Sequence, residues 1–179
     1  MSIAGWLLKK AGWKYEANTD IPAKCVVVVA PHTSNWDFIL GELATRSVGI
    51  KANFLMKDTW FFFPVGNIMR ALGGIPVKQG KHTRVTDEVV EAFNSRESMI
   101  IGVTPEGTRS RNGIWHKGFW HIAKAAHVPV LLAYIDYSKR TVCIDKEYPI
   151  SEDIETDIAG IKDYYKNYIG KHPENFITE

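Results

Sequence analysis

The sequence predicts an α/β fold, a single-domain sandwich in which helices cover a mixed, largely parallel sheet. Three observations predict it. A length of 179 residues suits one domain, and 45% of the residues are hydrophobic, which is enough for a sizeable core. Continuous β-branched runs, such as KCVVVVA at residues 24–30, are typical of strands buried on both faces. Segments with helical spacing of apolar residues separate these runs.

The first half of the chain supplies two strand–helix pairs. Residues 24–30 are the first buried strand, and residues 35–48 follow as a helix because their apolar side chains recur at helical spacing. Residues 52–56 form a short apolar strand. A helix over residues 65–72 is expected to end at the two glycines that follow it, since glycine commonly terminates helices.

The second half continues this alternation. Residues 75–78 are expected as a short strand at an edge of the sheet, because the proline there cannot donate to a ladder. A helix over residues 83–94 carries its apolar side chains on one face, and residues 98–103 form another buried strand. The remaining elements are a helix, two strands that pair and a closing helix, at residues 118–126, 130–137, 141–144 and 154–168.

Charge is balanced over the whole chain but not along it. The formal net charge is +2. Residues 51–86 carry six basic side chains against one acidic side chain, whereas residues 145–179 carry nine acidic side chains against four lysines. A basic middle indicates contact with an anionic ligand or surface, and a solvated dipolar surface is the alternative.

Membrane spans and disulfides are not expected. The longest apolar runs fall far short of the roughly 20 residues that a membrane-spanning helix needs. The two cysteines, Cys25 and Cys143, lie in apolar runs and are expected to be reduced core residues of a cytosolic protein. The N-terminal lysines follow the first apolar stretch instead of preceding it, so no signal peptide is expected.

A loop that could carry a catalytic base follows the first buried strand. In residues 31–37 (PHTSNWD), four residues separate His32 from Asp37, and a helix starting near Asn35 would bring the carboxylate back toward the imidazole. A carboxylate on one ring nitrogen raises the basicity of the other, which gives a general base for a hydroxyl proton. The alternative is structural, with Ser34 or Asn35 as the helix N-cap.

A second polar loop, TPEGTRSR at residues 104–111, follows another buried strand, and ligands of open α/β sheets bind beyond such strand ends. Gly107 permits close approach of the backbone. Arg109 and Arg111 suit bidentate contact with phosphate. Glu106 could orient Arg109 or contact a substrate hydroxyl. A solvated surface loop is the alternative.

Together these loops resemble the glycerolipid acyltransferase family, the PlsC-like family typified by 1-acylglycerol-3-phosphate O-acyltransferase. His32, Ser34 and Asp37 match its H-x-S-x-x-D core, and EGTRS at residues 106–110 matches its second block. The resemblance implies the same α/β fold.

The resemblance covers residues 24–137 and includes two further blocks. GIPVK at residues 74–78 stands where the family has a glycine, apolar residues and usually an arginine, and VPV at residues 128–130 stands where it has an apolar strand with a proline. Two departures, Pro31 where the family commonly has Asn and Lys78 in place of Arg, leave the acceptor substrate open.

The resemblance implies an acyltransferase of phospholipid biosynthesis. It would move a fatty acyl group from an acyl thioester, acyl-CoA or acyl-carrier protein, to a hydroxyl of a lysophospholipid such as 1-acylglycerol-3-phosphate. His32 would remove the hydroxyl proton and Asp37 would orient His32, with no acyl-enzyme, no metal and no bound cofactor. The residues implied to bind the substrate are Ser34, Lys78, Glu106, Gly107, Thr108 and Arg109.

The chain is rich in aromatic residues, with six Trp, eight Phe and seven Tyr. One apolar cluster is expected to line an acyl-chain tunnel or to dip into the bilayer interface, with core packing as the alternative. It consists of Trp60, Phe61, Phe62 and Phe63.

Residues 1–20, with Trp6 and Trp13, are expected to form an interfacial helix ahead of an acyltransferase domain at residues 21–179. Both features predict a protein of the cytoplasm that is peripheral on the inner face of the cell membrane.

Two other function classes stay open. The same base could activate water in a thioester or phosphoester hydrolase, although a G-x-S-x-G elbow and a metal-ligand set are missing from the sequence. A non-catalytic peripheral lipid-binding module is the second. Nucleic-acid binding is disfavoured by the small net charge. Zinc binding is disfavoured because His116, His121 and His127 do not share one helical face.

Overall fold

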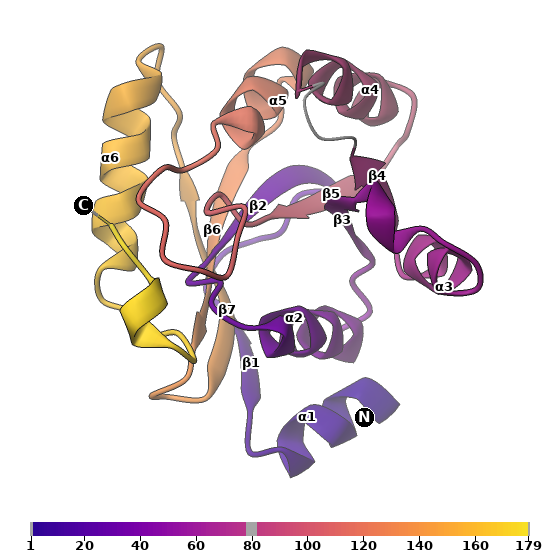
Figure 1. Ribbon diagram of the computed structural model, residues 1–179, viewed down its shortest axis with the longest axis vertical. Helices are drawn as coiled ribbons and strands as arrows, with labels where there is room; N and C mark the ends of the chain where they lie inside the picture. Colours follow the sequence, from indigo (N-terminus) through magenta and orange to yellow (C-terminus); the bar gives the residue numbers. More distant parts are fainter. Residues whose placement is uncertain (1, 78–81, 179) are drawn as a thin grey trace.

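The computed structural model describes residues 2–77 and 82–178, and it shows a seven-stranded sheet with helices on both faces (Figure 1). The strand order is β1-β7-β6-β2-β5-β3-β4, and all neighbours pair in parallel except β6 and β7, which are antiparallel. The predicted α/β fold is therefore confirmed. The strands are β1 (Lys14–Ala17), β2 (Lys24–Ala30), β3 (Ala52–Lys57), β4 (Gly74–Val77), β5 (Met99–Val103), β6 (Val130–Asp136) and β7 (Thr141–Tyr148).

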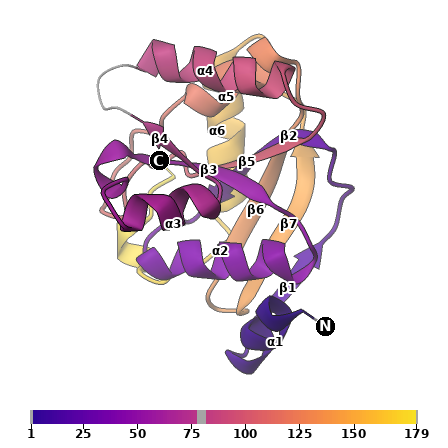
Figure 2. The ribbon, with the colours of Figure 1, turned by 90° about the vertical axis from the view of Figure 1, so that its right-hand side faces the viewer.

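The helices lie close to their predicted positions, with short 3-10 turns that the sequence pattern did not indicate. In Figure 2, α1, α2 and α3 lie on one side of the sheet, and α4, α5 and α6 lie on the other. The helical elements are α1 (Ile3–Lys10), α2 (Asn35–Ser47), η1 (Asp58–Trp60), α3 (Val65–Ala71), α4 (His82–Asn94), α5 (Gly118–Ala126), α6 (Ile154–Tyr165) and η2 (Pro173–Asn175).

The central strand β2 explains why the sequence run at its position is apolar throughout. Its edges pair with β5 and β6, and packed side chains lie on both of its faces, so most of its residues are buried. Val26 and Val28 pack with α4, α5 and α6, whereas Cys25 and Val27 belong to the cluster on the opposite face. Each buried valine contributes roughly 1.5–3 kcal/mol from its removal from water. Cys25 and Cys143 are free and buried, as predicted for core residues.

The predicted helix over residues 1–20 is wrong in extent. The helix ends at Lys10, and Gly12 then turns the chain with a φ of +76°. Lys14–Ala17 is instead a strand that adds to the sheet edge beside β7. The helix is also not purely interfacial, because Leu8 is buried against α2.

Strand β4 forms the opposite edge of the sheet, as predicted from its proline. Lys78, the residue expected to assist phosphate binding, lies outside the described residues. Strand β7 runs four residues past its predicted end, because its outer half is only partly buried and lacks the apolar pattern used to find it. Within the described ranges, none of the helices has the length and apolarity to cross a membrane.

Candidate active site

His32 and Asp37 face each other at the end of β2. The distance from His32 Nδ1 to Asp37 Oδ2 is 3.3 Å. The Asp37 side chain is 2% exposed, whereas the imidazole is 15% exposed and so has access to solvent. Because the carboxylate holds Nδ1, Nε2 is the ring nitrogen available to accept a proton. The predicted pairing is confirmed.

Both carboxylate oxygens of Asp37 are fixed by hydrogen-bond donors. Oδ2 accepts from the backbone N–H groups of Thr33 and Ser34, at 2.8 Å each. Oδ1 accepts from the hydroxyl of Tyr137 at 2.6 Å. A carboxylate with donors on both oxygens cannot rotate away without leaving buried groups unpaired, so the orientation toward His32 is built in.

The helix cap and the acid–base pair use the same residues. Ser34 Oγ accepts from the backbone N–H of Trp36 at 3.2 Å, and Asp37 returns a bond to Ser34, which closes a capping box. The structural alternative for this loop is therefore also true, and it fixes the position of the pair. Ser34 is 9% exposed and acts as a cap.

The buried side chain of Glu106 contacts the backbone of His32. Its Oε1 accepts from the backbone N–H of His32 at 2.8 Å. The residue is 4% exposed, and its Oε2 has no hydrogen-bond partner among the described residues. Burial raises the pKa of this carboxyl to about 7. This placement differs from the predicted contact with a substrate hydroxyl or phosphate, because the β2 and β5 loops meet and bury the side chain between them.

The backbone of the second loop is held in a defined shape. Gly107 has a φ of +63°, and a Cβ there would overlap the ring of His116. Asn112 Nδ2 donates to the carbonyl oxygen of Glu106 at 3.1 Å. Thr108 is half-buried and Gly107 and Arg109 are exposed, so the loop presents these three toward solvent as expected for ligand contact.

The two arginines of this loop have separate surroundings. Arg111 Nη1 donates to the carbonyl oxygen of Glu174 at 3.1 Å, which ties the loop to the C-terminal segment. Both arginines are exposed, but only Arg111 is engaged by a described hydrogen bond, so Arg109 is the better placed of the two for an anion.

The chain after α6 reaches the histidine loop, which sequence reasoning missed. The backbone N–H of His172 donates to Thr33 Oγ1 at 3.1 Å. A Cβ on Gly170 would lie 2.8 Å from the same oxygen. Lys171 Nζ lies 5.4 Å from the centre of the Trp36 ring. The segment thus supports the loop that holds Asp37.

An apolar groove adjoins Asp37 on the α2 side. It encloses about 290 Å³ and is lined by Ala11, Trp13, Trp36, Ile39, Leu40, Leu43, Tyr137 and Lys171. The Trp13 ring packs edge-on against Tyr137, with 4.8 Å between ring centres. Tyr137 therefore belongs both to this groove and to the hydrogen bonds of Asp37.

The aromatic cluster after β3 points outward. Trp60 is 47% exposed, Phe62 is 56% exposed and Phe63 is 84% exposed. Phe61 is partly buried, and the Arg70 guanidinium lies 5.0 Å from its ring centre. Core packing, the alternative for this cluster, is therefore wrong for the three exposed rings. Trp6 on α1 is also 49% exposed.

Among residues 2–77 and 82–178, no group of three or more His, Cys, Asp or Glu side chains is arranged to hold a metal ion. Two of the three histidines considered for zinc pack elsewhere: His116 lies against Gly107 and His121 lies 5.2 Å from the Trp120 ring.

Comparison with known proteins adds three findings. A family model described as Acyltransferase matches residues 12–136. The chain is 29% identical over 154 residues to human 1-acyl-sn-glycerol-3-phosphate acyltransferase beta, a match that covers 77% of this chain and 54% of that protein. The chain thus spans about half the length of this curated relative. The crystal structure of the 1-acyl-sn-glycerophosphate (LPA) acyltransferase, PlsC, from Thermotoga maritima superposes with a TM-score of 0.59 at 17% identity, covering 93% of this chain and 78% of that one, so the two share a fold.

Proposed function

The chain belongs to the acyltransferase family, and we propose that it transfers a fatty acyl group from an acyl thioester to a hydroxyl of a lysophospholipid such as 1-acylglycerol-3-phosphate. The observation that carries the proposal is the His32–Asp37 pair, in which a buried carboxylate with fixed orientation faces a partly exposed imidazole. Such a pair is suited to take a proton from a substrate hydroxyl.

The proposed reaction is a direct transfer in which His32 serves first as base and then as acid. Nε2 takes the hydroxyl proton as the hydroxyl oxygen attacks the thioester carbonyl. The new C–O bond forms, the C–S bond breaks, and the imidazolium returns its proton to the leaving thiolate. Asp37 keeps Nδ1 protonated and stabilises the imidazolium while it exists. No step uses a metal or a bound cofactor.

The phosphate of the acceptor is proposed to bind the loop after β5. Arg109 is exposed there and can form two parallel hydrogen bonds with a phosphate, and Gly107 lets the backbone approach. Thr108 adds a hydroxyl. Lys78 stays a prediction from the family pattern. Glu106 contributes indirectly, by holding the backbone of His32.

The acyl donor is proposed to be acyl-CoA or acyl-carrier protein, and the protein is proposed to work at the inner face of the cell membrane as a peripheral protein of the cytoplasm. The side of the molecule formed by α1, α2, η1 and α3 carries most of the exposed large apolar side chains (Figure 2). Tryptophan favours the membrane interface, and lysines close to it favour anionic head groups. On α1, Lys10 Nζ lies 4.9 Å from the Trp6 ring.

Product analysis tests this function. The purified full chain is incubated with acyl-CoA, or in parallel with acyl-carrier protein, and with a panel of lysophospholipids, and the lipids are identified by mass spectrometry. We expect a diacyl product that forms only when an acceptor is present. Release of free fatty acid at the same rate with and without acceptor would instead identify a thioester hydrolase. Lipid binding without turnover of any substrate would identify a non-catalytic module.

A further inference from the structure

Tyr137 touches the acid–base pair from the side opposite the histidine. We propose that Tyr137 is a positioning residue for this pair: its hydroxyl fixes Oδ1 of Asp37, so that Oδ2 stays directed at His32. The inference rests on the proposed function, because it assigns Tyr137 a part in the reaction that His32 would catalyse.

The two carboxylate oxygens of Asp37 have different hydrogen-bond partners. Oδ2 meets two backbone donors and the imidazole, whereas the Tyr137 hydroxyl, at 2.6 Å, is the donor to Oδ1 among the described residues. The carboxylate is 2% exposed, so water has little access to replace that donor. Loss of the hydroxyl would therefore leave Oδ1 buried and unpaired, and the carboxylate would be held through Oδ2 alone.

The Tyr137 hydroxyl is a donor and not an acceptor in this contact. Burial and the hydrogen bond to Asp37 both raise the pKa of Tyr137 above its ordinary value. The phenol therefore keeps its proton throughout the neutral range. A hydrogen bond from a neutral donor to a charged acceptor is among the stronger kinds in proteins.

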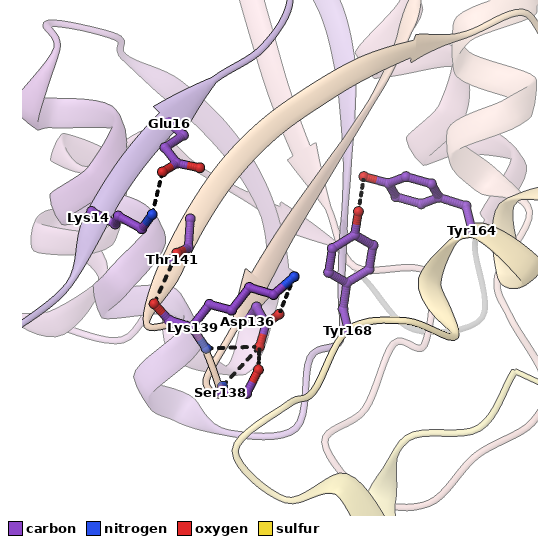
Figure 3. A network of polar contacts seen from close by, with 8 residues as sticks. All are labelled: Lys14, Glu16, Asp136, Ser138, Lys139, Thr141, Tyr164 and Tyr168. Atoms are coloured by element: carbon purple, nitrogen blue, oxygen red, sulfur yellow. Dashed lines mark hydrogen bonds and ion pairs between the residues drawn. The ribbon is translucent and has the colours of Figure 1, made fainter.

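The turn that carries Tyr137 is fixed by the residue before it. Asp136 Oδ1 accepts from the backbone N–H of Ser138 at 2.9 Å, from the Ser138 hydroxyl at 2.6 Å and from the backbone N–H of Lys139 at 3.3 Å (Figure 3). Asp136 is 1% exposed, so these bonds form in a largely dry environment. The connection between β6 and β7 therefore has little conformational freedom, and the backbone at Tyr137 is held in place.

Two further contacts fix the direction of the side chain. The backbone N–H of Tyr137 donates to the carbonyl oxygen of Ile169 at 2.8 Å. Its ring packs edge-on against Trp13, which lies between α1 and β1. With the backbone and the ring both held, the hydroxyl reaches Asp37 at low entropic cost, which is what a positioning residue requires.

Replacement of Tyr137 by phenylalanine tests the inference, because only the hydroxyl is removed. We expect kcat for acyl transfer to fall on the order of tenfold, the cost of a hydrogen bond to a charged group, while KM for donor and acceptor changes little. A general loss of packing would instead raise KM and lower kcat together.

The matched control is Tyr15→Phe. The Tyr15 hydroxyl is buried without a hydrogen-bond partner among the described residues, so its removal costs no contact at the pair. This variant should keep the wild-type kcat and KM. A second variant retains the hydroxyl: 3-fluorotyrosine at position 137 is a donor of nearly the same shape, and it should keep a kcat close to the wild-type value.

The outcomes separate the two proposals. Wild-type kcat in Tyr137→Phe would overturn the inference. So would a lower kcat together with a higher KM for both substrates, which is the result of a merely structural hydroxyl. His32→Ala is measured beside these variants. If His32→Ala retains near-normal transfer, the proposed function itself fails; if only Tyr137→Phe behaves as wild type, the function stands without this residue.

Discussion

Two buried carboxyl groups of the site, Asp37 and Glu106, differ in how many hydrogen-bond donors they meet. Asp37 is 3% exposed and Glu106 is 4% exposed. Asp37 accepts from two backbone N–H groups and a phenol, whereas Glu106 Oε1 accepts from the His32 N–H and Oε2 has no hydrogen-bond partner among the described residues. Burial penalises a charge unless hydrogen bonds compensate, and this difference suits Asp37 to act as a fixed charge.

Glu106 makes the stability of the fold depend on pH. Its pKa is raised by burial from 4.5 to about 7, so the folded chain holds a proton that the unfolded chain releases between these pH values. The free energy of unfolding should therefore fall as the pH rises through this range, by an amount on the order of 3 kcal/mol for a shift of this size. Glu106→Gln should lose that part of the slope. Urea unfolding at a series of pH values measures it.

The control for this prediction is Glu97→Gln, which replaces an exposed glutamate between α4 and β5. It should keep the wild-type slope. Parallel curves for wild type and Glu106→Gln would show that Glu106 titrates like an exposed carboxyl.

Arg109 is predicted to act on the phosphate of the acceptor. Arg109→Ala should raise KM for 1-acylglycerol-3-phosphate about tenfold or more, because a charge-assisted bidentate contact is lost, and should change kcat less. A monoacylglycerol without phosphate should not distinguish the variant from wild type. Steady-state kinetics with both acceptors makes the test, and Arg96→Ala, at another exposed arginine, is the control. An equal loss on both acceptors would contradict the assignment.

At the scale of elements, the C-terminal segment after α6 is predicted to control the histidine loop. Gly170 is buried with Thr33 Oγ1 2.8 Å from the position of a Cβ, so Gly170→Ala must displace the loop or the segment. We expect a loss of about 1–3 kcal/mol in unfolding free energy, as for other overpacked sites, and a lower kcat.

Gly41→Ala is the matched substitution on α2. No atom lies within 4 Å of a Cβ at this position, and alanine favours a helix more than glycine does. This variant should gain about 0.5–1 kcal/mol and keep its activity. Chemical denaturation measures both variants. A Gly170→Ala variant as stable and active as wild type would show that the C-terminal segment does not control the histidine loop.

Elements with a clear periodicity could be predicted from the sequence. The run of valines in β2 is buried on both faces, and the helix after it shows its apolar spacing, so both were found. Strand β1 was missed because its four residues, KYEA, carry no apolar signature, with only the two middle residues partly buried, and because its position depends on pairing with β7. Local patterns cannot indicate a strand that only a distant partner stabilises.

The residues of the site also differ in whether the sequence alone could predict them. His32 and Asp37 were predictable because one tight loop carries both. Tyr137 and His172 were not, since they reach the same loop from 100 and 139 residues further along the chain. The direction of Glu106 was misread for a related reason: its sequence neighbours are polar, but packing of the β2 and β5 loops buries it.

At the scale of the whole molecule, the exposed apolar side chains are unevenly distributed. Among the described residues, ten of the twelve large exposed apolar side chains belong to residues on or next to α1, α2, η1 and α3. The helices α1, α2 and α3 lie on one side of the sheet (Figures 1 and 2). An exposed apolar surface of this kind on an otherwise ordinary globular chain marks an interaction site. The same side carries the start of α2, where Trp36 lies next to the loop that holds His32.

This distribution predicts membrane binding through α3 and its neighbours. Phe62→Ser with Phe63→Ser removes two exposed rings, and binding to anionic liposomes, measured by flotation, should fall about a hundredfold or more, since each ring contributes roughly 1.5–3 kcal/mol when buried. Ile114→Ser, at an exposed residue outside these elements, is the control. Point changes are preferable to removal of α1, because Leu8 is part of the core. Unchanged flotation of the double variant would exclude these rings from the contact.

The central claim, that His32 is the base for acyl transfer, is tested most directly by the rate of one variant. His32→Ala and wild type are compared in acyl transfer from acyl-CoA to 1-acylglycerol-3-phosphate, with melting curves to show that both fold. General-base catalysis is worth about 10²–10⁴-fold, and the variant should lose at least that factor in turnover. A folded His32→Ala protein that transfers acyl groups at nearly the wild-type rate would contradict the account.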